Sequence, residues 1–262
     1  MYNSQITAFD IPDSWFRILK EILDHGYERP VFRGAREGHK RLELDSASIH
    51  ITNPSVRPLV PTVPDGIPPP TSVDYINQYV LSLMSPEKAD WEDYTYGQRM
   101  HQLLGVPEDY GTGQDERFIH MLKHDMIEGM RMSALDFNQF QTAMEMLKQT
   151  PESNRAMIEI GKPEDLLLKH PPCMRYVQFK VRYERLHIWV YFRSWDAWAG
   201  YVSNLPALQL VSEYVAKQLG VQSGEMFAFS AGLHLYDDSF ELARQVVVPK
   251  TIPRSEHHVQ GQ

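Results

Sequence analysis

The sequence predicts a chain of mixed helices and strands in which one sheet is covered on both faces. Two observations lead to this prediction. Apolar residues recur at helical spacing in several segments, and residues 174–192 show the alternation of a β-hairpin whose two faces are both largely apolar. A sheet that is apolar on both sides must be covered on both, by helices or by a second subunit.

The first expected helix covers residues 14–25, where apolar side chains return every three or four positions. Ser14 or Asp13 can cap its start, and Gly26 ends it. The same spacing predicts helices over 72–85, 114–133 and 136–149, the last with Asp136 as a candidate cap.

A final long helix is expected to open at Pro206, because the proline ring suits the first turn of a helix, and to close at Gly220. Asn204 then lies just ahead of this helix, so capping is the plain alternative to a functional role for it.

Strands are expected where apolar residues alternate along the chain or gather in short runs. The candidates are 41–52 with a break at Asp45-Ser46, 155–160, the hairpin strands Met174–Val181 and Leu186–Phe192, and Phe227–Leu235.

The length favours a single domain over residues 1–262. The proline-rich segment 53–71 is expected to be an extended loop, because the roughly 50 residues before it are few for a separate core. The polar tail 249–262 is expected to be loose.

Charge and cysteine content limit the partners and the compartment. The formal charge of −8 argues against general nucleic-acid binding, but a few arginines could still hold a small phosphorylated ligand. One cysteine excludes an intramolecular disulfide and fits a reducing compartment. The first residues lack the pattern of a signal peptide, and no stretch has the roughly 20 apolar residues of a membrane span. We therefore expect a cytoplasmic protein without membrane partners.

The single cysteine, Cys173, lies on a Pro-Pro loop, and a distinctive series of polar residues follows it. Arg193, Asn204, His234 and Tyr236 come next in the chain. A lone cysteine is most often a buried structural residue. A thiol on such a loop, followed by a guanidinium, an amide and a His/Tyr pair, instead favours covalent chemistry on an anionic ligand.

This order of residues resembles the thymidylate synthase family, in a divergent, archaeal-like form. The resemblance implies an α+β fold with one large mixed sheet, helices on one face, and the other face packed in a homodimer. The motifs that carry it are Tyr96-Gly97, the segment 147–155, Pro171-Pro172-Cys173, Gln178-Phe179, Arg193-Ser194-Trp195-Asp196 with Gly200 and Asn204, the segment 213–224, and His234-Leu235-Tyr236.

The resemblance implies a methyltransferase that converts dUMP to dTMP with 5,10-methylenetetrahydrofolate. The thiolate of Cys173 would add to carbon 6 of the uracil ring, so that carbon 5 can attack the methylene carried by the folate. Arg193 would bind the phosphate and favour the thiolate, and Tyr96 is a further catalytic candidate. The amide of Asn204 would donate to the uracil carbonyl and accept from its ring N–H, a pattern that cytosine reverses.

The remaining site residues are also implied by the resemblance. Family members take an arginine of the 147–155 segment from the partner subunit, which makes Arg155 a phosphate candidate. Arg33 is another phosphate candidate, with Arg36 as its replacement, although a plain surface arginine is the alternative for either. Ser194 is expected to contact the phosphate, Asp196 the folate, and His234 with Tyr236 the sugar hydroxyl.

The sequence also departs from the family pattern. Met174 follows the cysteine where many members have histidine, Phe192 stands where many have glutamine, and Asn154 precedes Arg155 where an arginine is usual. Gln78 is nearest to the position of the catalytic glutamate, and no folate-capping segment is recognisable after Tyr236.

These departures leave alternatives open. A pyrimidine-nucleotide hydroxymethylase acting on dUMP or CMP would use the same folate, with water capturing the methylene. A ribonucleotide substrate and a non-catalytic nucleotide-binding relative are the other options. The histidines lack the spacing and thiol partners of a zinc site, so no metal is expected.

Overall fold

The computed structural model describes residues 1–32, 36–105 and 136–247. Three expectations lie outside the described residues: the helix over 114–133, the role of Arg33 and the loose tail over 249–262.

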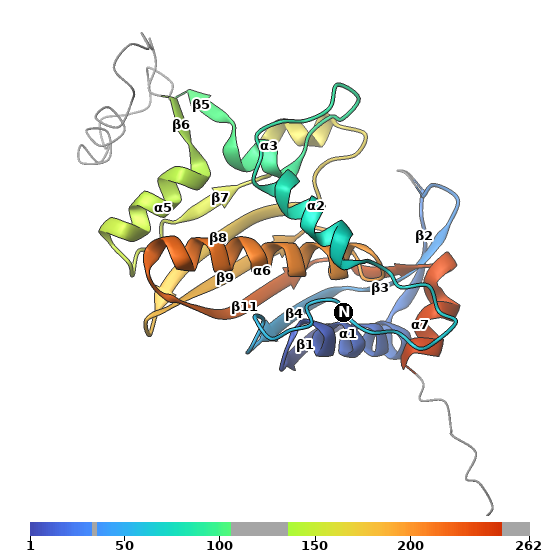
Figure 1. Cartoon of the computed structure of the whole chain (residues 1–262). Helices are drawn as coiled ribbons and strands as arrows, with labels where there is room; N and C mark the ends of the chain where they lie inside the picture. Colours follow the sequence, from blue (N-terminus) through green and yellow to red (C-terminus); the bar gives the residue numbers. More distant parts are fainter. Residues whose placement is uncertain (33–35, 106–135, 248–262) are drawn as a thin grey trace, which may run out of the picture.

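A six-stranded sheet forms the centre of the molecule, with the strand order β1-β4-β11-β9-β8-β7 (Figure 1). β1 and β4 are parallel, as are β9 and β11, whereas the other neighbours are antiparallel. The large mixed sheet of the expected α+β fold is therefore confirmed. Its strands are β1 (Asn3–Ala8), β4 (Ser46–Ile51), β7 (Met157–Glu159), β8 (Met174–Arg182), β9 (Arg185–Phe192) and β11 (Gln222–Ser230).

A second sheet has the order β10-β12-β3-β2. The predicted break at Asp45 is real, and it sends the two halves of the 41–52 segment into different sheets. The predicted strand over 227–235 is likewise two strands in two sheets, which corrects the single strand expected there. The strands of this sheet are β2 (Tyr27–Pro30), β3 (Lys40–Leu44), β10 (Trp195–Asp196) and β12 (Leu233–Tyr236), and a separate pair joins β5 (Leu103–Gly105) to β6 (Asp136–Asn138).

Two long helices link the parallel strand pairs. α1 (Ile11–His25) lies in the connection from β1 to β4, and α6 (Gly200–Leu219) in the connection from β9 to β11. The two crossovers run in opposite directions between oppositely directed strands, so right-handed connections place both helices on one face of the sheet. The hydroxyl of Tyr201 in α6 donates to Ser14 Oγ in α1 at 2.8 Å, which shows that these helices touch.

Shorter helices complete the described fold, and α2 crosses above α6 in Figure 1. α2 confirms the helix expected over 72–85, with Ser72 as its cap. The bounds are α2 (Val73–Leu83), α3 (Tyr96–His101), α5 (Gln139–Gln149) and α7 (Phe240–Val247), with 3-10 turns at η1 (Pro163–Leu167) and η2 (Asp237–Ser239).

Two of the predicted caps are wrong. The carboxylate of Asp10 accepts the backbone N–H of Asp13, so α1 begins three residues earlier than expected. The helix expected from 136 begins at Gln139, because residues 136–138 pair as β6 and the side chain of Asn138 caps the helix instead of Asp136.

The start of α6 also differs from the prediction. The helix begins at Gly200, and Pro206 lies inside it rather than at its first turn. The reason is the carboxylate of Asp196, which accepts the backbone N–H groups of Trp198, Ala199 and Gly200 and so supports an earlier start. Asn204 is therefore a residue of the helix and not its cap, whereas the predicted end at Gly220 is confirmed by its left-handed conformation.

The central sheet has two different faces. Under the helices, Ile188, Val190, Met226 and Ala228 are at most 1% exposed. On the opposite face, Trp189 stacks on Phe227 with ring centres 4.9 Å apart. The same half-buried face carries His50 stacked on Phe227, and Tyr176 stacked on Tyr191.

Candidate active site

Cys173 lies at the end of the loop that precedes β8, directly opposite Arg193 at the end of β9. Antiparallel pairing places the start of β8 beside the end of β9, so the two residues meet although they are 20 positions apart. Arg193 Nη2 lies 3.7 Å from Cys173 Sγ. Its guanidinium also donates to the carbonyl oxygens of Pro172 at 3.0 Å and Pro171 at 2.6 Å, which fixes the loop around the sulfur.

The thiol is half-buried, and this burial raises the pKa of Cys173 above its usual value. The guanidinium of Arg193 opposes the effect by favouring the thiolate, whereas the carboxylate of Asp196 adds to it. An anion bound to Arg193 would therefore also influence how much of the thiol is ionised.

Tyr96 stands on the other side of the loop. Its hydroxyl accepts the backbone N–H of Met174, at 3.3 Å, and burial raises the pKa of this phenol well above its usual value. Gly97 explains how α3 reaches this place, because a Cβ there would lie 1.8 Å from the carbonyl oxygen of Ser82. The glycine thus lets α3 pack directly against the end of α2.

Asn204 projects from α6 and is held by two aromatic residues. Trp195 Nε1 donates to Asn204 Oδ1 at 2.9 Å, and Asn204 Nδ2 donates to the hydroxyl of Tyr79 at 2.8 Å. Asn204 is only partly buried, whereas its neighbours Ser203 and Leu205 are buried. The two hydrogen bonds leave one lone pair of Oδ1 and one N–H of Nδ2 without a partner among the described residues.

Asn204 borders a cavity of about 550 Å³, which Tyr75 and Tyr79 also help to line. A second cavity of about 420 Å³ shares Tyr75 and Tyr79 and extends to Tyr94 and Tyr96. Burial raises the pKa of Tyr94 to about 12, with the charge of Cys173 as the next cause. The described cavities thus lead from the amide of Asn204 toward the thiol loop.

His234 and Tyr236 come from β12 in the second sheet. His234 is 3% exposed, and its Nδ1 lies 2.9 Å from the carbonyl oxygen of Gly232, so this nitrogen carries the proton. Nε2 is then an acceptor, and it is buried without a hydrogen-bond partner among the residues that the structure describes. Burial lowers the pKa of His234, which keeps the ring neutral. A ligand hydroxyl could satisfy Nε2.

Two residues of the Arg193-Ser194-Trp195-Asp196 motif have other surroundings. Asp196 already accepts three backbone N–H groups at the start of α6, so its role in the structure is that of a helix cap. Ser194 lies between β9 and β10 and is partly buried. Contacts of Asp196 with folate and of Ser194 with phosphate stay predictions.

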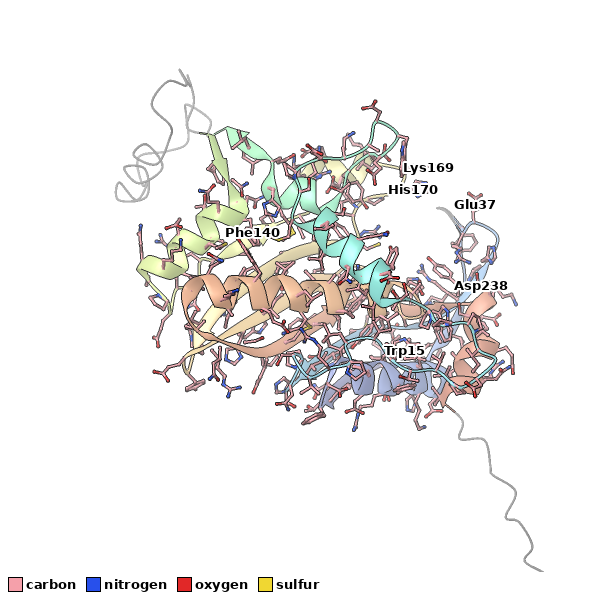
Figure 2. The ribbon with its side chains drawn as sticks, in the orientation of Figure 1. Trp15, Glu37, Phe140, Lys169, His170 and Asp238 are labelled. Carbon is pink, nitrogen blue, oxygen red and sulfur yellow. The ribbon has the colours of Figure 1, made fainter. Side chains whose placement is uncertain are left out.

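The phosphate candidates outside this motif lie in different places. Arg36 has its guanidinium 5.0 Å from the ring centre of Tyr236 and pairs with Asp238. Figure 2 shows Asp238, and also Glu37, which follows Arg36 in the chain, on the same side of the view as Lys169 and His170. Lys169 and His170 directly precede the thiol loop. Arg33 lies outside the described residues.

Arg155 is distant from the thiol of its own chain. The carbonyl of its neighbour Ala156 accepts the N–H of Phe179, and Phe179 is six residues along β8 from Cys173. At about 3.3 Å per residue this separation is about 20 Å, more than an arginine side chain can span.

Sequence reasoning missed Tyr79. Its position in the apolar stripe of the 72–85 helix is typical of a core residue, and only the partner of its hydroxyl reveals a role. Trp195 belongs to the Arg193-Ser194-Trp195-Asp196 motif, but nothing in that motif indicates that its indole N–H reaches Asn204.

Comparison with known proteins decides the family. A family model described as thymidylate synthase matches residues 86–260, roughly two thirds of the chain. The chain belongs to the thymidylate synthase family. This family is a class of methyltransferases, so the expectation of an enzyme is confirmed at that level.

Archaeal members of the thymidylate synthase family are similar over almost the whole length. A Methanosarcina mazei protein named "Putative thymidylate synthase" is 28% identical over 245 residues, covering 92% of this chain and 94% of the relative. A Methanothermobacter thermautotrophicus protein with the same name is 25% identical over 252 residues, covering 92% and 97%. The expected archaeal-like character of the sequence is thereby confirmed.

The described residues contain neither a membrane-spanning helix nor a cluster of metal-binding side chains. None of the helices there has the length and apolar character needed to cross a bilayer. No group of three or more His, Cys, Asp or Glu side chains gathers into a metal-binding arrangement in residues 1–32, 36–105 and 136–247.

Proposed function

We propose that this member of the family is a thymidylate synthase, which methylates dUMP to dTMP with 5,10-methylenetetrahydrofolate. The observation that carries the proposal is the thiol of Cys173, 3.7 Å from the guanidinium of Arg193. A nucleophile beside an anion-binding group suits attack on a base whose phosphate the arginine holds.

Each candidate residue has its own role in the proposed reaction. Arg193 binds the phosphate of dUMP and draws the thiol of Cys173 toward its charged form. The thiolate forms a bond to carbon 6 of the ring, and the electron pair moves through carbon 5 to the carbonyl oxygen. Asn204 donates the remaining N–H of its rigidly held amide to that oxygen, which stabilises the developing charge. Nε2 of His234 accepts from the sugar hydroxyl.

The cavity beside Asn204 fits the folate. Its volume of about 550 Å³ is in the range of ligand pockets, and the aromatic ring of Tyr75 and the prolines Pro69 and Pro70 give it flat apolar walls. Tyr75, Tyr79 and Gly200 would hold the ring system of the folate, next to a uracil ring that takes the side of the cavity at Asn204. When bound, the folate supplies the one-carbon unit and the reducing hydride.

A hydroxymethylase is the second candidate, and one observation favours it. The cavity of about 420 Å³ is lined by the polar side chains of Gln78, Ser82, Glu92 and Thr95, which could hold a water close to the reacting carbon. Water would then capture the methylene in place of hydride, and tetrahydrofolate would leave without oxidation.

The experiment that tests the function is incubation with dUMP and 5,10-methylenetetrahydrofolate. Mass spectrometry of the nucleotide separates a methyl from a hydroxymethyl product, and the formation of dihydrofolate shows the hydride transfer. Cys173→Ser is expected to abolish turnover and to change dUMP affinity by less than about threefold, because a hydroxyl is a poor nucleophile at neutral pH. Equal loss of binding and turnover would contradict a covalent role. CMP and dCMP in parallel reactions test the other substrates.

We infer that the protein forms a homodimer through the sheet face opposite the helices. Trp189, Phe227, Tyr176 and Tyr191 form paired aromatic stacks on this face, and a two-fold axis would bring two such faces together. Phe227→Asp is expected to give a monomer in sedimentation. Tyr183→Asp, at the exposed turn between β8 and β9, is a matched control that should stay dimeric.

The dimer would also supply Arg155 from the partner subunit, since its own thiol is about 20 Å away. Subunit mixing tests this. In a co-folded 1:1 mixture of Cys173→Ser and Arg155→Ala chains, half of the dimers are mixed and each has one intact site. About a quarter of wild-type activity should return if Arg155 acts across a two-fold interface. No recovery would mean that Arg155 acts within its own chain.

A further inference from the structure

The amide of Asn204 is held in one orientation by its neighbours. Its Oδ1 accepts from Trp195 Nε1 at 2.9 Å, and its Nδ2 donates to the hydroxyl of Tyr79 at 2.8 Å. An indole N–H can only donate, so the atom that faces Trp195 has to be the oxygen. A phenol hydroxyl both donates and accepts, so Tyr79 could pair with either end of the amide.

The hydrogen bonds that remain open on this amide match one type of base. An asparagine side chain has two acceptor lone pairs and two N–H donors. Trp195 uses one lone pair and Tyr79 one N–H, which leaves one acceptor and one donor on a residue that lines the cavity. The uracil ring presents an N–H and a carbonyl oxygen, so it fills both positions, with the N–H to Oδ1 and the carbonyl to Nδ2.

Cytosine would require the amide to turn over, because its ring nitrogen accepts and its amino group donates. After the turn, Nδ2 would face the indole N–H of Trp195, donor against donor. Trp195 cannot move aside easily: it is 2% exposed and stacks on Phe192 with ring centres 4.0 Å apart and planes within 5°. Its other face contacts Tyr201 at 4.5 Å between ring centres.

We propose that Trp195 sets the selectivity for uracil over cytosine by fixing the orientation of the Asn204 amide, while Tyr79 holds the amide without choosing between the two bases. This inference rests on the proposed function, because it takes Asn204 as the residue that meets the base. Trp195 is a positioning residue that acts through Asn204.

Changes at Trp195 and at Tyr79 are expected to affect the ratio of dUMP to dCMP affinity differently. Without the indole N–H, the amide is free to turn, and the ratio of dUMP to dCMP affinity should fall by about tenfold or more. A change of this size is expected because the dCMP complex no longer contains a buried indole N–H that lacks an acceptor. Without the hydroxyl of Tyr79, the amide loses a partner in both orientations. Both nucleotides should then bind more weakly, with their ratio changed by less than about twofold.

The experiment measures dUMP and dCMP binding by titration calorimetry on the full chain. Trp195→Phe is the first variant. A second variant places 3-benzothienylalanine at position 195, which keeps the size of the indole and removes only its N–H, and so guards against a loss of folding. Tyr79→Phe is the third. Tyr201→Phe is the matched control, since it removes a buried phenol hydroxyl from the same helix and leaves Asn204 untouched.

The expected result is a lower ratio of dUMP to dCMP affinity for both changes at position 195, and a wild-type ratio for Tyr79→Phe and Tyr201→Phe. A benzothienyl variant that binds dUMP and keeps the wild-type ratio would overturn the inference. A fall in the ratio for Tyr79→Phe as large as that for position 195 would overturn the division of roles. Wild-type protein that binds neither nucleotide would overturn the proposed function itself.

Discussion

A buried ion pair next to the thiol loop gives the sharpest stability prediction. Asp165 is 1% exposed, and its Oδ1 accepts from Arg99 Nη2 at 2.6 Å. Its Oδ2 accepts the backbone N–H of Lys162 at 2.7 Å and lies 3.4 Å from Arg175 Nη1. The pair joins α3, which carries Tyr96, to the segment before the thiol loop and to the start of β8.

Asp165→Ala would leave the guanidinium of Arg99, whose side chain is 9% exposed, without its nearest counter-charge. Removing one partner of a buried pair costs about 3–5 kcal/mol, because the other charge stays buried without compensation. Asp24→Ala is the control, since it breaks an exposed pair with Lys20 that is worth about 0.5 kcal/mol or less.

The dependence on pH has a defined sign. Burial alone would raise the pKa of Asp165, but the N–H of Lys162 and the charge of Arg99 outweigh it and lower the pKa below the usual carboxyl value. The carboxylate therefore stabilises the fold above the unfolded pKa of about 4, and this contribution is lost as the pH falls through the lower folded value. At pH 7 the full stabilising contribution of the ionised Asp165 is present.

The assay is urea unfolding of wild type and both variants at pH 7, followed by repeats at falling pH. We expect Asp165→Ala to lower the free energy of unfolding by about 3–5 kcal/mol at pH 7. Below pH 4 the difference in free energy of unfolding between this variant and the wild type should narrow. A loss of less than about 1 kcal/mol, similar to that of Asp24→Ala, would show that Arg99 is adequately solvated without its partner.

Two further predictions concern the thiol and the packing of α3. Arg193→Ala should raise the pKa of Cys173 further, so alkylation by iodoacetamide at pH 8, followed by mass spectrometry, should slow several-fold; an unchanged rate would mean that the guanidinium does not influence the thiol. Gly97→Ala should lower the melting temperature strongly or prevent folding, because the new Cβ would lie 1.8 Å from the carbonyl oxygen of Ser82. Gly232→Ala, with its nearest atom at 3.5 Å, is the steric control, and equal melting of both variants would show that α3 can shift.

The sequence predicted the β8–β9 hairpin well because its signal is local. Both faces are apolar, and the turn at Tyr183 and Glu184 has the positive φ values of a tight two-residue connection. β1 was missed for the opposite reason. Its residues are mostly polar, and the strand exists because its backbone pairs with β4, a partner more than 40 positions away.

The candidate site likewise combines local sequence motifs with contacts that the sequence does not reveal. The family motifs single out Cys173, Arg193 and Asn204, but they do not reveal that Asn204 lies inside a helix, because Pro206 is typical of a first helical turn. Proline suits the first turn of a helix, whereas inside a helix it removes one hydrogen bond and crowds the carbonyl four residues earlier, so an interior position has to be supported by other contacts. Here the cap supplied by Asp196 moves the start to Gly200.

Two of the departures from the family pattern, Met174 and Phe192, lie in one contact network. Met174 and Phe192, which replace polar residues common in the family, are opposite each other in the β8–β9 ladder, and both are 0% exposed. Phe192 in turn stacks on Trp195, whose N–H reaches the amide of Asn204. A histidine or glutamine at these two buried positions would need hydrogen-bond partners of its own, whereas apolar side chains need only close packing. The same substitutions that weaken the sequence match therefore build the rigid wall on which the orientation of Asn204 depends.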